Sequence, residues 1–272
     1  MGAEWRARIA ARLSVLRHRA EAARPDFARR FDRAAQGREP GPAGLAALAH
    51  FGDALVIDAD PRALTHMLAD APGNTPGVVP GDANGETLRS RRFVAHGDWS
   101  GALSRVADDA VFREMADLVA LRERFADGRA HAVLLDRARH GERTLRNGID
   151  LDGAEAIDRY MRHYLALVRA IERDGYRRLE RGRDTGPMRP RSAEMRETEV
   201  CVALAADGTL LRFVGGRHRL AIAAKLGLPR IPVLVRGVHA EFLREQAERR
   251  ALTPYEAFRA WLAGEAQKSR SE

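Results

Sequence analysis

The stretch FVGGRHRLAIAAKLGLPRIPV, residues 213–233, restricts the possible folds of this chain more than any other part of it. An apolar run ends at Gly215 and Gly216, an alanine-rich run follows, and a second glycine precedes the next apolar run. Paired glycines permit a sharp turn, and a glycine just past an alanine-rich segment is typical of a helix end. The pattern therefore predicts a strand, a tight turn, a helix over 217–226 and a buried strand over 231–235.

The residues just before this stretch, ETEVCVALAADGTLLRFV, have the pattern of a β-hairpin. Two apolar runs, 200–205 and 209–214, flank an Asp207-Gly208 turn. Cys201 lies in the first run and is expected to be a small core residue, and a lone cysteine provides no disulfide framework or cysteine-based zinc site. Hairpin, helix and strand together predict an α/β (α+β) fold.

Helical periodicity and breaker residues divide the rest of the chain. We expect a helix over 4–35 broken near Pro25, a short helix over 45–50, a strand over 54–61, a long loop over 71–90, helices over 107–126 and 154–173, a basic loop over 181–192, and two final helices, the second with a Thr253–Glu256 capping box. This order predicts a helical N-terminal arm (1–50), a domain over 51–245 with its core at about 195–240, and a C-terminal helix and tail (246–272).

The charge of the chain is strongly positive, at +8 formal units. Only two of the 46 basic residues are lysine, and the arginines alternate with Asp and Glu along the expected helices. That distribution is typical of solvated helix faces, so nucleic-acid binding is possible but not favoured. No apolar run reaches the ~18 residues of a membrane span and no secretory signal is recognised, so we expect a cytoplasmic protein without membrane association.

The turn at Gly215 and Gly216 can bind an anion. The first residues of a helix carry free backbone N–H groups and a partial positive charge, to which phosphate is suited. Arg217 and Arg219 would add forked donors, and His218 a further donor or a proton carrier. The alternative is a plain strand-to-helix turn whose arginines pair with surface carboxylates.

The same residues resemble the core of the ParB/sulfiredoxin superfamily. The similarity to ParB rests on a G-x-x-R element, an alanine-rich helix and a P-V strand, here Gly216, Arg219, Ala223 and Ile231-Pro232-Val233. Sulfiredoxins carry a related G-G-C-H-R element, but Arg217 stands at the position of their catalytic cysteine. Sulfiredoxin chemistry is therefore not expected.

The chain is also similar to a largely uncharacterised ParB-like branch often found near surface-glycan genes. The matching segments are Gly97-Asp98-Trp99, Asp174-Gly175-Tyr176 and the stretch 199–239, within a span of about 54–245. The resemblance implies a fold with more certainty than it implies an activity.

The superfamily resemblance implies that ATP, ADP or CTP binds with Mg²⁺, and that a phosphoryl group passes to a small-molecule or glycan-related acceptor. The nucleotide-binding residues would be Gly215, Gly216, Arg217, His218 and Arg219, and the catalytic candidates Glu197, Glu199, Asp98 and His218. Each of these carboxylates could instead be a solvated strand or turn residue, and no zinc-type ligand set is expected. We also expect Arg219→Ala to abolish nucleotide binding while leaving the fold intact.

Two other functions stay open. One is a ParB-like DNA-binding or regulatory protein, since residues 247–262 have some similarity to the segment after the ParB core, although nothing marks a recognition helix. The other is a non-catalytic nucleotide-sensing module that works through a partner.

Overall fold

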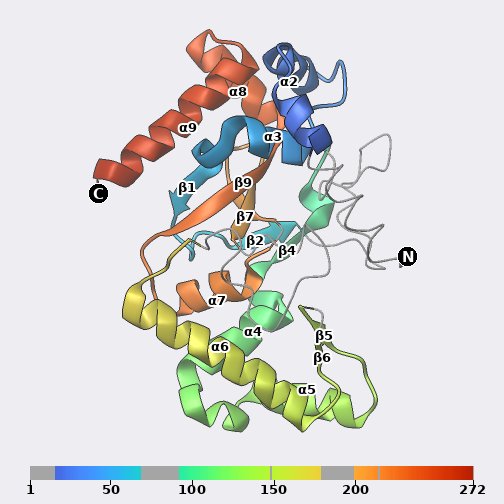
Figure 1. Cartoon of the computed structure of the whole chain (residues 1–272), viewed down its shortest axis with the longest axis vertical. Coiled ribbons are helices and arrows are strands. Elements are labelled where there is room, and N and C mark those ends of the chain that lie inside the picture. Colours follow the sequence, from blue (N-terminus) through green and yellow to red (C-terminus); the bar gives the residue numbers. More distant parts are fainter. Residues whose placement is uncertain (1–15, 69–91, 148, 179–198, 214, 272) are drawn as a thin grey trace.

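The computed structural model describes residues 16–271 except 69–91, 148, 179–198 and 214. The expected loops over 71–90 and 181–192, and the candidate Glu197, lie outside the described residues. The centre of the molecule is a mixed seven-stranded sheet in the order β1-β9-β7-β8-β2-β4, with β3 also paired to β9 (Figure 1). The strands are β1 (Val56–Ala59), β2 (His66–Leu68), β3 (Val94–Ala95), β4 (Leu103–Arg105), β7 (Val200–Leu204), β8 (Leu210–Arg212) and β9 (Ile231–His239).

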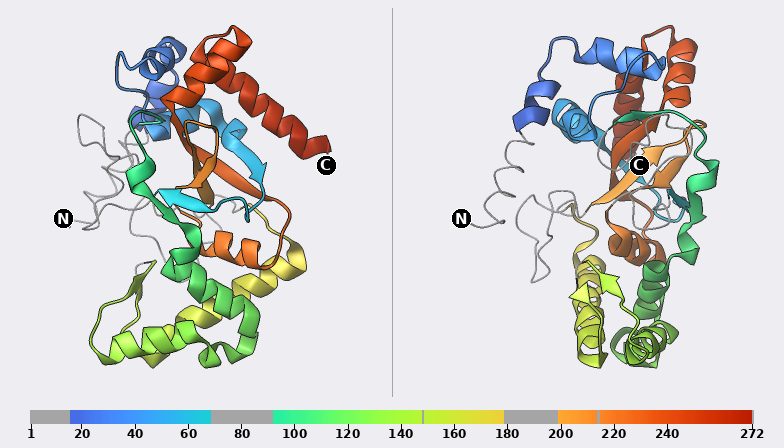
Figure 2. Two further views of the ribbon diagram at one scale, coloured as in Figure 1. Left: turned by 180° about the vertical axis from the view of Figure 1, so that it is seen from behind. Right: turned by 90° about the vertical axis from the view of Figure 1, so that its right-hand side faces the viewer.

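Helices lie at both ends of this sheet, as Figures 1 and 2 show. One group comprises α2 (Phe27–Ala35), α3 (Gly44–Phe51), α8 (Ala240–Arg250) and α9 (Pro254–Ser271). The other comprises α4 (Ala110–Leu121), α5 (Arg129–Arg139), α6 (Ala154–Asp174) and α7 (Arg217–Lys225), with a small hairpin of β5 (Leu145–Arg146) and β6 (Ile149–Asp150). Short 3₁₀ segments are Gly52–Leu55, Ser100–Ala102, Val106–Asp108 and Arg122–Asp127.

The expectations for the glycine-containing stretch and its hairpin are confirmed in outline. β7 and β8 are antiparallel, with Leu204 opposite Leu210, and α7 then leads to β9, which is parallel to β7. The helix break near Pro25 and the Thr253–Glu256 capping box are also present, with Glu256 N–H donating to Thr253 Oγ1 and Thr253 N–H to Glu256 Oε2. The sequence did not indicate α5 or the β5–β6 hairpin, and β9 continues four residues beyond the expected strand.

Helix α7 lies between two hydrophobic clusters. Its Leu220 and Ala223 pack in the cluster formed by the sheet with α2, α3, α8 and α9, and Ala221 and Ile222 pack in the cluster formed by α4, α5 and α6. Small alanine side chains let a helix approach both neighbours closely, which explains an alanine-rich segment at this position. No helix in the described part of the chain is both long and apolar enough to cross a bilayer.

Candidate functional site

The turn between β8 and α7 is held tightly against β7. Gly215 and Gly216 both have positive φ, at 69° and 59°. A Cβ atom on Gly216 would lie 2.5 Å from both Cα and N of Val200 and 2.7 Å from the carbonyl carbon of Glu199. Glycine is thus required here by backbone conformation and by close approach. The turn brings Glu199 and Val200, where β7 begins, beside the start of α7.

At the N-terminus of α7, three backbone N–H groups have no hydrogen-bond partner among the described residues. The first helical hydrogen bond runs from Leu220 N–H to Gly216 O, 2.8 Å long. No described residue accepts from the N–H groups of Arg217, His218 or Arg219, and no described side chain caps the helix. Three neighbouring N–H donors at a helix start form an environment suited to an anion.

Two arginines flank this turn. Arg212 is buried and donates from Nη2 to the carbonyl oxygen of Gly215, 3.0 Å away. Arg217 is 38% exposed and pairs through Nη1 with Asp109 Oδ2 at 3.1 Å. That bond uses one of the five guanidinium N–H donors of Arg217, so the others remain for a ligand.

Arg219 makes buried contacts with the segment that follows α6. Its side chain is buried, its Nε donates to Tyr176 Oη at 3.1 Å, its Nη2 donates to the carbonyl of Arg177, and its guanidinium lies 4.4 Å from the Tyr176 ring centre. Burial raises the pKa of Tyr176 to about 12, although Arg219 opposes the change, so the phenol remains protonated. Arg219→Ala would remove these buried contacts, so a stability measurement must accompany any test of nucleotide binding in this variant.

His218 belongs to a buried polar chain that the sequence did not reveal. Its Nε2 lies 3.0 Å from Tyr160 Oη, and Tyr160 in turn donates to Glu114 Oε2 at 2.6 Å. Arg146 closes the chain with bonds to both Glu114 oxygens, 2.6 Å from Nη2 to Oε1 and 3.1 Å from Nε to Oε2. The members come from α4, the β5–β6 hairpin, α6 and α7.

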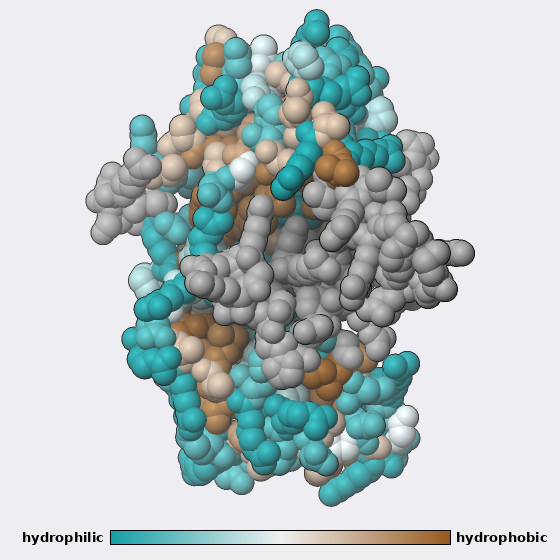
Figure 3. All heavy atoms as spheres, viewed as in Figure 1, coloured by the Kyte–Doolittle hydropathy of each residue, from teal (hydrophilic) through white to brown (hydrophobic). Residues whose placement is uncertain are grey.

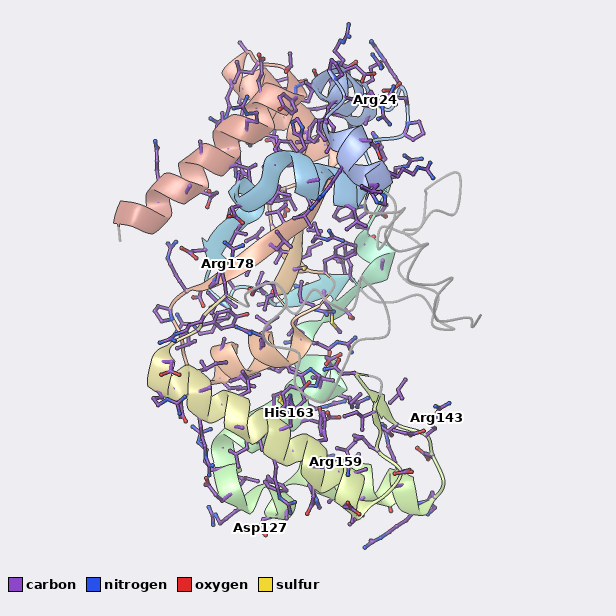
Figure 4. All side chains as sticks on the ribbon, viewed as in Figure 1. Arg24, Asp127, Arg143, Arg159, His163 and Arg178 are labelled. Atoms are coloured by element: carbon purple, nitrogen blue, oxygen red, sulfur yellow. The ribbon has the colours of Figure 1, made fainter. Side chains whose placement is uncertain are left out.

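Aromatic packing fixes the His218 ring. The ring stacks on Tyr164 with centroids 3.9 Å apart and an angle of 2° between the planes. The hydroxyl of Tyr164 accepts a hydrogen bond from Asn147 Nδ2. Figure 4 labels His163, the neighbour of Tyr164 on α6, at the place where α6 passes α4 and α7.

The environment of His218 determines its protonation. Burial, with the positive charges of Arg217 and Arg146, lowers the pKa of His218 well below its ordinary value, so the ring is neutral at pH 7. Burial and Glu114 raise the pKa of Tyr160 well above its ordinary value, so its hydroxyl keeps its proton. His218 is therefore a neutral imidazole at pH 7, ready to accept a proton and not to donate one as an imidazolium.

The two candidate carboxylates among the described residues, Glu199 and Asp98, lie in different parts of the structure. Glu199 is half-buried at the start of β7, directly beside Gly216. Asp98 is exposed and accepts from Ser100 N–H (2.8 Å) and Ser100 Oγ (2.9 Å), so it fixes a local turn. The carbonyl of Gly97, next to Asp98, accepts a hydrogen bond from His239 at the far end of β9. Val200, which follows Glu199, pairs with Val233, six residues before His239 on the same strand. At ~3.3 Å per residue, Asp98 is therefore ~20 Å from Glu199 along the sheet. The structure thus brings Glu199, but not Asp98, to the turn.

A signal for Glu114 was present in the sequence. It lies three residues after Val111 and next to Met115, on the apolar side of the expected helix, where a carboxylate needs a buried partner. The partner could not be named, because Tyr160 and Arg146 follow Glu114 by 46 and 32 residues.

Among the described residues, no group of three or more His, Cys, Asp or Glu side chains is arranged to hold a metal ion. Comparison of the chain with family models, curated proteins and solved structures found no significant match. The functional conclusion therefore depends on the site itself.

Proposed function

We propose that this protein binds the phosphate groups of a nucleotide at the Gly215–Arg219 turn and transfers a phosphoryl group to a small-molecule or glycan-related acceptor. The observation that carries the proposal is the set of three N–H donors at the start of α7 that no described residue uses, one of them from the buried neutral His218. Phosphoryl transfer depends mainly on positioning and on charge stabilisation, which such donors and the remaining N–H groups of Arg217 supply.

The order of elements supports the proposed likeness to the ParB/sulfiredoxin superfamily. An antiparallel hairpin, a glycine turn, a buried helix and a strand parallel to the first hairpin strand follow one another in the core. In this arrangement Glu199 and Gly216 come together from opposite sides of the hairpin. We infer that Glu199 lies beside the bound phosphates and helps to hold Mg²⁺ there.

The pairing of the surface arginines weighs against a nucleic-acid partner. On α6, Arg162 pairs with Asp158 at 3.0 Å, Arg159 with Glu155 at 3.5 Å, and Arg169 with Glu123. Arginines whose charge is balanced locally contribute little to a phosphate-binding stripe. The face shown in Figure 3 is mostly hydrophilic where the chain is described, with hydrophobic residues in separate patches.

Calorimetric titration of ATP, ADP and CTP, each with Mg²⁺, tests the proposal. Arg217→Ala should weaken binding by ~10- to 100-fold, the equivalent of one charge-assisted hydrogen bond of ~1.5–3 kcal/mol. The matched control is Arg159→Ala, which removes the same charge from a site 61% exposed on α6 (Figure 4) and should leave affinity unchanged.

The results would separate the possible functions. Failure of the wild type to bind any of the three nucleotides would refute the proposal and make the glycine pair a plain turn. Binding that Arg217→Ala and Arg159→Ala weaken equally would locate the ligand elsewhere. Binding without phosphoryl transfer to any acceptor tested would favour a nucleotide-sensing module.

A further inference from the structure

The buried chain Glu114–Tyr160–His218 fixes which nitrogen of His218 carries a hydrogen. Tyr160 has a single hydroxyl hydrogen, and it lies in the 2.6 Å bond to the Glu114 carboxylate. The 3.0 Å contact between Tyr160 Oη and His218 Nε2 therefore needs its hydrogen from Nε2. A neutral ring that carries its hydrogen on Nε2 has an unprotonated Nδ1.

The unprotonated nitrogen belongs to a residue of the proposed phosphate site. Nδ1 is bonded to Cγ, the ring carbon attached to Cβ, so it is the ring nitrogen closer to the backbone. His218 is the second residue of α7, so it belongs to the first helical turn, whose backbone N–H groups have no hydrogen-bond partner among the described residues. No described residue hydrogen-bonds to Nδ1, although the His218 side chain is only 7% exposed.

We propose that His218 accepts the proton of the acceptor hydroxyl through Nδ1, and that Tyr160 and Glu114 position it for this role. The inference rests on the proposed phosphoryl transfer. Apolar residues of similar volume would fill the space between α4, α6 and α7 without the cost of desolvating a carboxylate and a guanidinium. A chain of directed hydrogen bonds that ends on a free ring nitrogen instead serves to orient a base.

The proposed step balances as follows. The acceptor hydroxyl oxygen forms a bond to the terminal phosphorus of the nucleotide, and the bond from that phosphorus to its bridging oxygen breaks. The shortened nucleotide leaves with the electron pair of the broken bond, and the hydroxyl proton moves to Nδ1 of His218. The positive charge on the ring is stabilised by Tyr160 and, through it, by Glu114.

Nitrogen-15 NMR of the histidine rings at pH 7.5 tests the positioning. His218 should show a protonated Nε2 and an unprotonated Nδ1, with His218→Gln used to assign its signals. Two other histidines calibrate the spectrum. His239 donates from Nε2 to Gly97 O (2.8 Å) and accepts at Nδ1, whereas His50 donates from Nδ1 to Ala22 O (2.9 Å).

Tyr160→Phe keeps the ring at this position and removes the hydroxyl, so the Nε2-protonated form of His218 should lose its preference while His50 and His239 stay unchanged. A wild-type His218 protonated on Nδ1 would overturn the inference. An unaltered His218 spectrum in Tyr160→Phe would do the same, because the hydroxyl would then have no positioning role.

A second titration separates this inference from the proposed function. A non-hydrolysable analogue of the nucleotide that binds most tightly, added with Mg²⁺, should shift the Nδ1 signal of His218 but not that of His50. Binding detected by calorimetry without a His218 shift would refute the role of His218 and leave the nucleotide site standing. If no nucleotide binds, the proposed function fails and this inference fails with it.

Discussion

Gly216 is constrained both by its backbone angle and by its neighbour, and substitutions can separate the two effects. Its φ is 59°, and an added Cβ would lie 2.5 Å from the Val200 backbone. Gly227 has a similar φ of 71° but nothing within 4 Å of an added Cβ. Gly227→Ala should therefore lower the free energy of unfolding by ~1–2 kcal/mol, the strain of a left-handed backbone at a residue with a side chain. Gly216→Ala carries the same strain and must also displace β7.

Urea unfolding of the two alanine variants provides the measurement. We expect the free energy of unfolding to fall by at least ~2 kcal/mol more in Gly216→Ala than in Gly227→Ala, in the range of backbone clashes that a core cannot relieve. Equal losses of unfolding free energy would mean that β7 shifts at little cost to accept the added methyl group. The close approach of Gly216 to Val200 would then contribute nothing to the requirement for glycine.

His218 should make the stability of the protein depend on pH. Its pKa lies well below the ordinary value of about 6.5 in the folded state, so between these two values the unfolded chain binds more protons. Stability from the neutral ring is then complete above pH 6.5 and is lost as the pH falls toward the folded-state pKa. The urea midpoint of the wild type should fall between pH 7.5 and pH 5, and His218→Gln should show a smaller fall.

The comparison variant for this pH effect is His140→Gln, which removes a histidine whose side chain is 69% exposed. Parallel profiles for wild type and His218→Gln would show that the ring titrates normally. His163 and His239 also have lowered pKa values, so the difference between proteins, and not the absolute slope, reports on His218.

At the same scale, the sequence predicted the glycine turn but only half of the site. The turn depends on neighbouring residues, and glycine pairs carry a local conformational signal. The partners of His218 depend on contacts between distant segments: Tyr160 is 58 residues away. The contacts of Arg219 are hidden for the same reason, because nothing in a G-x-x-R spacing shows that its Nε and Nη2 donate to Tyr176 and to the Arg177 carbonyl.

The β5–β6 hairpin is attached to the helices by the buried pair of Arg146 and Glu114. Their side chains are 15% and 4% exposed. Arg146→Met should destabilise the protein by ~3–5 kcal/mol, because it leaves the Glu114 charge buried without its partner. Adding Glu114→Gln should restore most of that loss, and urea unfolding of the wild type, both single variants and the double variant gives the coupling energy.

An exposed pair is the matched control for this cycle. Arg143 and Asp150 belong to the same hairpin region, at 75% and 36% exposure, and should couple by no more than ~1 kcal/mol. A coupling of Arg146 with Glu114 as small as that of the exposed pair would show that the buried network does not hold the hairpin.

The helices and strands that the sequence predicted are those with a regular spacing of apolar residues or with a clear stop signal such as glycine or proline. The helices over 107–126 and 154–173 and the strand over 200–205 are of this kind, and each is present within a few residues. β9 was expected to end at residue 235 because Arg236 and Gly237 interrupt the apolar run. In the structure Arg236 is buried within the strand, so the protein environment overrides the local polarity.

Over the whole molecule, three segments that the sequence separates share one core. Phe31 of α2 stacks on Phe258 of α9 with ring centroids 5.8 Å apart, and both contact Phe93 beside β3. These segments belong to the expected arm, tail and central domain. No local pattern reveals such a cluster, because each aromatic residue is equally consistent with packing inside its own segment.

The two hydrophobic clusters should unfold together, because α7 contributes residues to both. Phe258→Ala in one cluster should cost ~3–5 kcal/mol and Leu134→Ala in the other ~2–5 kcal/mol. Each variant should lower a single urea midpoint that is the same by tryptophan fluorescence and by far-ultraviolet circular dichroism. Val133→Ala, at a neighbouring position that is 43% exposed, should change stability by no more than ~0.5 kcal/mol. Separate transitions in either core variant, with one probe shifted and the other not, would instead support independent units, and the site at the start of α7 would then lie at a boundary between them.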